Sequence, residues 1–230
     1  MTNTLIREWD CFDAYLFDID GTLLNCSDAV HYFAFCNTLT AIAGRPLTLD
    51  GVTAHGNTDV GILRDALALA GVDAAVWRPR LGTMQEEICH FVEERKQDVC
   101  VAVMPQVLTV LQRLSERGAT LGVATGNLER VGKIKLERAS LARYFQFGAW
   151  SDAFENRLDV IASGKATARS LAGENAAICV IGDTPADVRA ARENGLSVIA
   201  VATGIYPFEE LAAAGPDLCI HSFADLPGVA

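Results

Sequence analysis

The fold is decided by residues 13–22, which read DAYLFDIDGT. The first half of this stretch is largely apolar and predicts a short buried strand, which ends at the polar residues that follow. Similar apolar runs recur further along the chain, at residues 119–124, 176–181, 196–201 and 217–220. Continuous apolar runs without alternation are typical of parallel strands that are covered on both faces.

Helical patterns separate these runs, at residues 105–117, 128–139, 158–171 and 186–194. Strands that alternate with helices predict an α/β fold with a doubly wound parallel sheet, that is, a Rossmann-like core. Residues 24–99 interrupt the alternation, because three helices are expected there in succession, over 28–43, 58–70 and 85–96. We therefore expect a core formed by residues 1–23 and 100–230, with a helical unit inserted at 24–99.

The composition excludes several classes of partner. The 230 residues carry a formal net charge of −10, which repels nucleic acid and anionic lipid, so neither is an expected partner. No apolar stretch approaches the ~18 residues needed to span a bilayer, and residues 1–10 do not resemble a signal peptide. Seven cysteines without metal-site spacing indicate reduced thiols. Together these features predict a cytoplasmic protein.

The polar residues share one position relative to the predicted strands, since each lies at a carboxyl end or just beyond it. They are Asp18, Asp20, Thr125, Asn127, Asp183 and Asp187. Ligands of open α/β sheets bind at this edge. Carboxylates gathered there repel each other unless a cation lies among them, and their oxygen atoms suit Mg²⁺. The sequence therefore predicts a magnesium site.

The spacing of these residues also indicates how they would divide the chemistry. Asp18 and Asp20 are two residues apart, so in an extended chain both side chains project the same way, one as nucleophile and the other as general acid and base. Thr125 offers a hydroxyl, and the backbone amides of Gly126 and Asn127 can bind phosphate at the start of the next helix. Each residue alone could instead form a turn or a helix cap; their occurrence together favours a catalytic site.

At these residues the chain resembles the haloacid dehalogenase-like hydrolases, over nearly its whole length. Three motifs of that superfamily stand here in order, as DIDGT at 18–22, TGN at 125–127 and GDTPAD at 182–187. The resemblance implies a nucleophile at Asp18 and an acid/base at Asp20. It also implies Mg²⁺ held by Asp18, the Asp20 carbonyl oxygen and Asp183, with Asp187 supporting the water shell of the metal.

A further motif of the superfamily is altered. Many relatives place a lysine, usually followed by proline, ahead of the last motif, and this chain has no Lys-Pro pair. Arg157 stands close to the matching position and can neutralise Asp18 and a phosphate with its guanidinium. Lys133, Lys135 and Lys165 compete for this role. We favour Arg157, with Lys133 next.

The helical insert resembles the cap domain of the branch that contains phosphoglycolate phosphatase and β-phosphoglucomutase. Such caps close over the site and contact substrate. Residues 54–59 resemble the cap loop that does so, which makes His55 and Thr58 candidate substrate-binding residues, although Thr58 could simply cap a helix and His55 could lie at the surface. Hinges are expected near residues 23–26 and 99–104.

The presence of Asp20 favours phosphoryl transfer within this superfamily, because both halves of the reaction need an acid or a base there. We therefore expect a Mg²⁺-dependent phosphatase that acts on a small phosphorylated metabolite through an aspartyl-phosphate. A sugar-phosphate mutase, a dehalogenase and a non-catalytic binding protein on the same scaffold remain alternatives. The sequence identifies neither the natural substrate nor the oligomeric state.

Overall fold

The computed structural model describes residues 8–229, and its centre is a six-stranded parallel sheet in the order β5-β4-β1-β6-β7-β8. The strands are β1 (Ala14–Phe17), β4 (Thr120–Ala124), β5 (Phe147–Ala149), β6 (Ile178–Gly182), β7 (Ser197–Val201) and β8 (Leu218–Ile220). The central strand β1 pairs with β4 on one side and with β6 on the other, with Phe17 opposite Val123 and Ile181. The predicted α/β fold with a doubly wound parallel sheet is confirmed.

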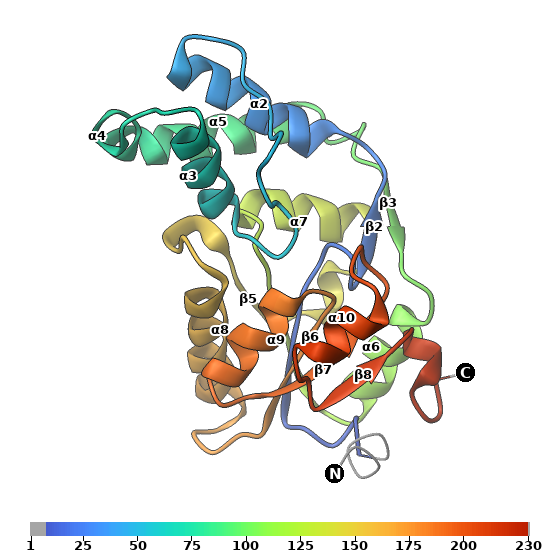
Figure 1. Cartoon of the computed structure of the whole chain (residues 1–230). Helices are drawn as coiled ribbons and strands as arrows, with labels where there is room; N and C mark the ends of the chain where they lie inside the picture. The colour runs from blue at the N-terminus through green and yellow to red at the C-terminus, as the bar shows by residue number, and fades with distance from the viewer. Residues whose placement is uncertain (1–7, 230) are drawn as a thin grey trace.

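Helices cover both faces of this sheet (Figure 1). They are α6 (Val107–Glu116), α7 (Glu129–Arg138), α8 (Arg157–Ala172), α9 (Pro185–Glu193) and α10 (Phe208–Ala213). Successive residues of β1 face opposite layers: Leu16 belongs to a buried cluster with Val160 of α8, whereas Phe17 belongs to another with Leu111 of α6. Burial on both faces explains why the strands are apolar without alternation.

A second group of helices lies beyond one end of the sheet, at the top of Figure 1. They are α2 (Val30–Ala43), α3 (Asp59–Leu69), α4 (Ala74–Trp77) and α5 (Leu81–Glu94), with a 3₁₀ turn at Arg78–Arg80. These helices share a buried apolar cluster that also contains Val131 and Ile134 of α7, so the group rests on a helix of the core. They fall within the predicted insert at 24–99, and its treatment as a separate domain stays a prediction.

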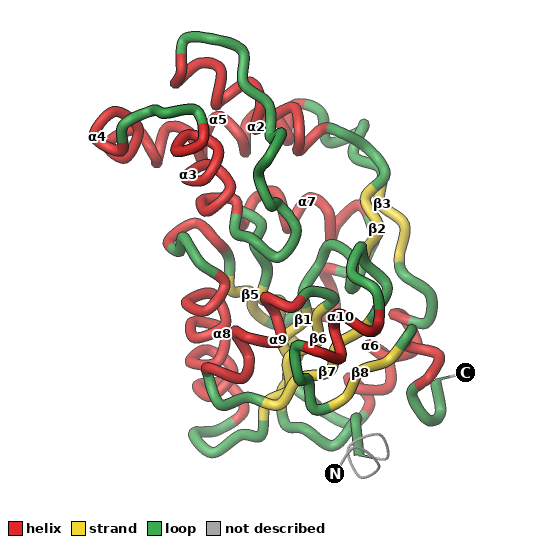
Figure 2. The backbone as a smooth tube through the Cα atoms, in the orientation of Figure 1, coloured by secondary structure: helices red, strands yellow, loops and turns green. Residues whose placement is uncertain are grey.

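Two short strands join the two groups of helices. β2 (Leu24–Cys26) pairs antiparallel with β3 (Val101–Val103), so that the outgoing and returning connections form one ribbon, drawn in yellow in Figure 2. The sequence analysis did not predict β2, β3, β5 or the one-turn helix α4, because elements of three or four residues carry too little periodicity to be recognised. The ribbon coincides with the expected hinges, whose motion stays a prediction.

The remaining elements are 3₁₀ turns at Ala142–Tyr144, Ser151–Ala153 and Phe223–Asp225. All seven cysteines are free, in keeping with the expected reduced thiols. Within residues 8–229, none of the helices combines the length and apolar character that crossing a membrane requires.

Candidate active site

The carboxyl ends of the central strands bring the predicted residues into one cavity of about 440 Å³. Asp18 directly follows β1, Thr125 follows β4 and Asp183 follows β6. The cavity is also lined by Asp20, Gly126, Asn127, Arg157 and His55. Asp187, on the first turn of α9, lies next to it and is 1 % exposed. Of the predicted site residues, only Thr58 and Asp187 are not part of the lining.

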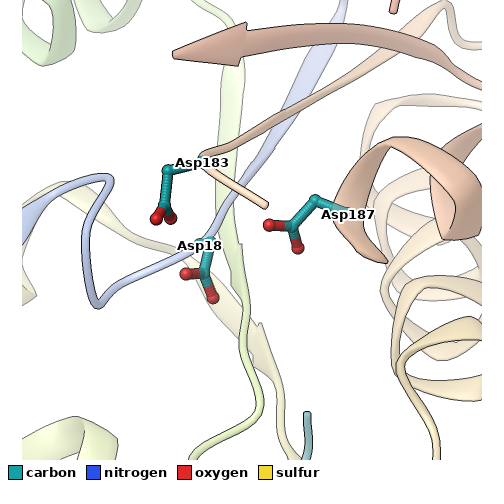
Figure 3. Close-up of side chains that lie close together, drawn as sticks. All are labelled: Asp18, Asp183 and Asp187. Carbon is teal, nitrogen blue, oxygen red and sulfur yellow. The ribbon is translucent and has the colours of Figure 1, made fainter. Parts of the chain in front are cut away.

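Three carboxylates lie close together beyond the carboxyl ends of β1 and β6 (Figure 3), and two of them, Asp18 and Asp183, line the floor of the cavity. Asp18, Asp183 and Asp187 are buried, and each offers an oxygen atom within 4.8 Å of the others. Burial and the charges of Asp187 and Asp20 raise the pKa of Asp18 to about 6, although the charge of Arg157 opposes the rise. Burial and the charges of Asp18 and Asp187 likewise raise the pKa of Asp183. A cation would relieve this repulsion.

Two glycines make room for the Asp183 carboxylate. A Cβ atom on Gly21, which has φ +87°, or on Gly204 would overlap the Asp183 carboxylate. The hydroxyl of Thr22 donates a hydrogen bond of 2.9 Å to Asp183 Oδ1 and fixes its orientation. The cluster thus consists of oriented, buried oxygen atoms, the donor set that suits a hard divalent cation such as Mg²⁺.

Arg157 joins two of these carboxylates. It is the first residue of α8, whose start is capped by Asn156. Its Nη2 lies 2.6 Å from Asp18 Oδ1 and 2.6 Å from Asp187 Oδ1, and its Nε lies 2.8 Å from the same Asp187 oxygen. The side chain is buried, so it neutralises part of the acidic charge where water cannot.

The competing lysines occupy different positions. Lys133 is 56 % exposed at its side chain and pairs with Glu129, and Lys165 donates to the carbonyl of Asn194. Neither lines the cavity. Among the four candidates, Arg157 is therefore the one that contacts Asp18, as the sequence favoured, while Lys133, the second choice, points away from the site.

Lys135 reaches the site by a different route. Its Nζ lies 2.7 Å from Asp20 Oδ2 and 2.7 Å from Asn127 Oδ1, and its side chain is only 7 % exposed. Asn127 Nδ2 in turn donates to Asp20 Oδ2 and to Thr125 Oγ1, both at 2.7 Å. Cys26 donates to the other Asp20 oxygen at 2.9 Å. Asp20 is thus held by its own network, separate from the three-carboxylate cluster.

The charge of Asp20 follows from this network. Burial disfavours its charged form, but the Lys135 ammonium and the hydrogen bonds from Cys26 and Asn127 outweigh burial and hold the pKa of Asp20 well below its ordinary value. The side chain of Asp20 is not one of the clustered ligands, so its part in holding a metal, through its carbonyl oxygen, stays a prediction.

Sequence reasoning gave Lys135 too little weight, although a signal was present. Lys135 lies four residues after Val131 and seven after Leu128, both of which are buried. A lysine on the buried side of a helix needs a partner, because burying a lone ammonium is costly. Helical periodicity could therefore have separated Lys135 from Lys133, two residues away on the exposed side.

The loop before α3 packs against the core beside the site. His55 lines the cavity, as expected of a candidate substrate contact. Thr58 is fully buried, and its hydroxyl accepts a hydrogen bond of 2.9 Å from the Gly61 amide, so it has the capping position that the sequence left open as an alternative. The Asp59 amide donates to the Gly126 carbonyl at 2.7 Å. The loop is therefore anchored on one of the predicted phosphate-binding residues.

Comparison with known proteins agrees with this geometry. The model of the haloacid dehalogenase-like hydrolase family matches residues 15–201. A phosphoglycolate phosphatase of Rhodobacter capsulatus is 28 % identical over 218 residues, which cover 94 % of this chain and 95 % of that one. The probable phosphatase IndB of Dickeya dadantii is 30 % identical over 128 residues, 56 % of each chain.

The fold recurs in solved structures. A haloacid dehalogenase-like hydrolase from Bacteroides fragilis superimposes with a TM-score of 0.69 at 19 % identity, over 94 % of this chain and 99 % of that one. At this identity the likeness concerns the fold alone.

Proposed function

This chain belongs to the haloacid dehalogenase-like hydrolases and is a phosphoric monoester hydrolase of their phosphoglycolate phosphatase-like branch, and we propose that it transfers the phosphoryl group of a small metabolite first to Asp18 and then to water. The observation that supports this most is the position of Asp18. It ends the central strand, contacts Arg157 and belongs to the carboxylate cluster in the cavity.

We propose that Asp18 and Asp183 hold Mg²⁺, together with the Asp20 carbonyl oxygen. Asp187, whose oxygens bind Arg157 and Thr184, would support the water shell of the metal. The support is the buried all-oxygen cluster, with the raised pKa values of Asp18 and Asp183. When bound, the ion would neutralise charge on the phosphate oxygens and on the attacking carboxylate. The carboxylates then approach a dianionic ester without the repulsion that they would otherwise exert.

In the first half of the proposed reaction, an Asp18 oxygen attacks phosphorus and the bond from phosphorus to the alcohol oxygen breaks. The electron pair goes to the alcohol oxygen, and Asp20 supplies its proton. Lys135 favours the charged form of Asp20. An arriving phosphate dianion disfavours this charged form, because a nearby like charge raises the pKa of a carboxyl group. Substrate binding itself therefore helps to place the proton on Asp20.

In the second half, Asp20 takes a proton from water while the water oxygen attacks phosphorus. The bond between phosphorus and Asp18 breaks, which releases inorganic phosphate and restores the Asp18 carboxylate. The Asp20 network suits this step, because the Lys135 ammonium and the Asn127 amide hold the carboxylate charged and oriented. General base assistance of this kind contributes roughly 10²–10⁴-fold.

The neighbouring residues would bind the phosphate and exclude water. Arg157 and the backbone amides of Gly126 and Asn127 are proposed to contact phosphate oxygens, with Thr125 at the same strand end. The helices α2–α5 would act as a cap over the cavity. In that cap, His55 is a candidate substrate contact, and Thr58 would act through the loop whose helix it caps.

The test is hydrolysis of p-nitrophenyl phosphate with Mg²⁺, followed as inorganic phosphate released. We expect Asp18→Asn to lower kcat by at least about 10³-fold. Asp98→Asn, an exposed residue outside the cavity, is the matched control and should retain wild-type activity. Asp20→Asn should accumulate protein with one phosphoryl group on Asp18, visible by mass spectrometry. Activity that survives Asp18→Asn would refute the assigned nucleophile.

A further inference from the structure

The lining of the cavity above Asp18 contains two chemically different sets of side chains. The acidic floor carries the proposed phosphate site. The lining also contains six large apolar side chains, which we call the apolar wall: Tyr32, Phe35, Leu49, Ile62, Met104 and Ile205. The first four come from the α2–α5 region, whereas Met104 follows β3 and Ile205 follows β7. A phosphate ester bound at the floor would direct its alcohol portion toward this wall.

Two members of the apolar wall are more exposed to water than large apolar side chains usually are. Tyr32 is 39 % exposed and Ile205 is 60 % exposed. Exposed apolar surface within a cleft is favourable only when a ligand covers it, and it is a recognised sign of a binding site. The phosphate end of the substrate cannot cover it, because the phosphate is held at the carboxylate floor.

The charges around the cavity disfavour a second anionic group on the substrate. Among the described residues, the lining contains four carboxylates (Asp18, Asp20, Asp59 and Asp183) but only two cationic side chains, Lys135 and Arg157. Arg157 is bound to Asp18 and Lys135 to Asp20. One divalent cation would balance the excess of negative charge in the lining. No positive charge would then remain to bind a carboxylate on the substrate in addition to its phosphate.

The arginines of the insert do not supply the missing charge. None of its five arginines lines the cavity: Arg45, Arg64, Arg78, Arg80 and Arg95. Arg78 Nη1 lies 2.6 Å from Glu155 Oε1, and Arg64 Nη1 lies 3.6 Å from Glu155 Oε2. These contacts hold the insert against the core rather than facing the substrate.

Two histidines line the cavity as well. His31 Nε2 lies 3.2 Å from Asp59 Oδ2, so this ring atom faces a carboxylate of the protein itself. The ring of His31 also stacks on Phe35, with centroids 4.9 Å apart, and extends the aromatic surface. His55 is exposed on its loop. Since imidazoles carry positive charge in acid, a test of substrate charge belongs at pH 8.

On the basis of the proposed phosphatase function, we propose that the substrate is a phosphate monoester of an uncharged alcohol that bears an aromatic or apolar group. The apolar wall covers that group, and the unbalanced carboxylates reject a second anion. This chain would then differ from its phosphoglycolate phosphatase relatives in substrate, because phosphoglycolate carries a carboxylate next to its phosphate.

Two matched pairs of esters test the proposal, each assayed for phosphate release with Mg²⁺ at pH 8. Benzyl phosphate is compared with 4-carboxybenzyl phosphate, and 2-hydroxyethyl phosphate with phosphoglycolate. We expect kcat/KM to be at least about tenfold higher for the uncharged member of each pair, and highest for benzyl phosphate. Equal or better turnover of the carboxylates would overturn the proposal while leaving the phosphatase function intact. No phosphate release from any ester would refute both.

Substitutions test whether the apolar wall causes the expected preference for benzyl phosphate. Tyr32→Ala should lower kcat/KM for benzyl phosphate about tenfold and for 2-hydroxyethyl phosphate much less. Leu69→Ala is the control, because Leu69 lies on α3, is 65 % exposed and does not line the cavity. Leu49→Arg should raise the rate for phosphoglycolate relative to benzyl phosphate about fivefold or more, because it adds the missing cation. Equal losses on both esters in Tyr32→Ala would contradict the assigned wall.

Discussion

The guanidinium of Arg157 lies 2.6 Å from the carboxylate of Asp18, although 139 residues separate them in the chain. Both side chains are buried, so water does not screen the pair, and the same guanidinium also binds Asp187. Arg157 therefore fixes the direction of the Asp18 carboxylate before any substrate arrives. A rigid, planar fork can hold two carboxylates in this way, whereas a lysine ammonium acts as a point charge.

Substitution of Arg157 should separate charge from geometry. Arg157→Lys keeps the charge but cannot bridge Asp18 and Asp187, so we expect kcat/KM to fall about 10- to 100-fold. Arg157→Met leaves two buried carboxylates uncompensated, which should destabilise the metal-free protein by about 3–5 kcal/mol and abolish most activity. Steady-state kinetics and thermal unfolding measure the two effects. Arg80→Lys, at an exposed position outside the cavity, is the control.

Lys135 should matter to catalysis without contacting phosphorus. In Lys135→Met, Asp20 loses its cation and part of its orientation, so we expect kcat to fall about 10²-fold with a smaller change in KM. The loss of the ammonium also raises the pKa of Asp20, and the acid limb of the kcat profile should move to higher pH, since the second half-reaction needs the charged form. Lys133→Met, on the same helix but exposed, should change neither. Equal effects of the two substitutions would contradict a role for the Asp20 network.

The core of the fold and the floor of the site could be predicted because each left a strong local signal. Apolar runs five or six residues long marked β1, β4, β6 and β7, and the polar residues after three of them gathered as the topology requires. Arg157 could be placed because the resemblance to the haloacid dehalogenase-like hydrolases puts a cation ahead of the last motif, close to residue 157. Here, sequence order, sheet topology and the family resemblance were sufficient together.

The missed features depend on contacts between distant segments. The strand β5 has three residues, and it is recognised only because β4 pairs with it. Lys135 contacts Asp20 and Asn127, and its own helix does not reveal these contacts. In the sequence, Thr58 fitted either a helix cap or a substrate contact. In the structure its hydroxyl accepts a hydrogen bond from the Gly61 amide, which is the bond of a helix cap. Such distinctions require coordinates.

Magnesium should stabilise the protein in a pH-dependent way. The pKa of Asp18 is raised from 3.8 to about 6, so the folded, metal-free protein binds protons more tightly than the unfolded chain. Stability from this source is present in acid and is lost as the pH rises through about 6. The rise in Tm on adding Mg²⁺ should therefore grow between pH 5 and pH 7.5, as differential scanning fluorimetry can measure. A Mg²⁺ effect that is constant or shrinks over this window would contradict the proposed site.

Removing one clustered carboxylate should have the opposite effects on stability and metal binding. Asp183→Asn keeps an oxygen that can accept from Thr22 but relieves the repulsion from Asp18 and Asp187. We expect the metal-free Tm to rise by about 2–8 °C, which corresponds to 1–2 kcal/mol for a chain of this length. The Mg²⁺-induced rise in Tm and the activity should both be lost. A variant that loses metal-free stability yet retains its Mg²⁺ response would place the metal elsewhere.

The contact between the loop before α3 and Gly126 gives a test of cap closure. A Cβ atom on Gly126 would overlap the carbonyl oxygen of Asn57, a backbone atom that cannot swing aside. Gly126→Ala should therefore push this loop off the core and weaken the hydrogen bond from the Asp59 amide, while leaving the carboxylate cluster in place. Since displacement of a positioning element by about 1 Å can cost 10²-fold, we expect kcat/KM to fall by that order while Mg²⁺ still raises the Tm. Gly82→Ala, whose added Cβ meets nothing within 4 Å, is the matched control. Wild-type kinetics in Gly126→Ala would mean that closure of this loop is not needed for turnover.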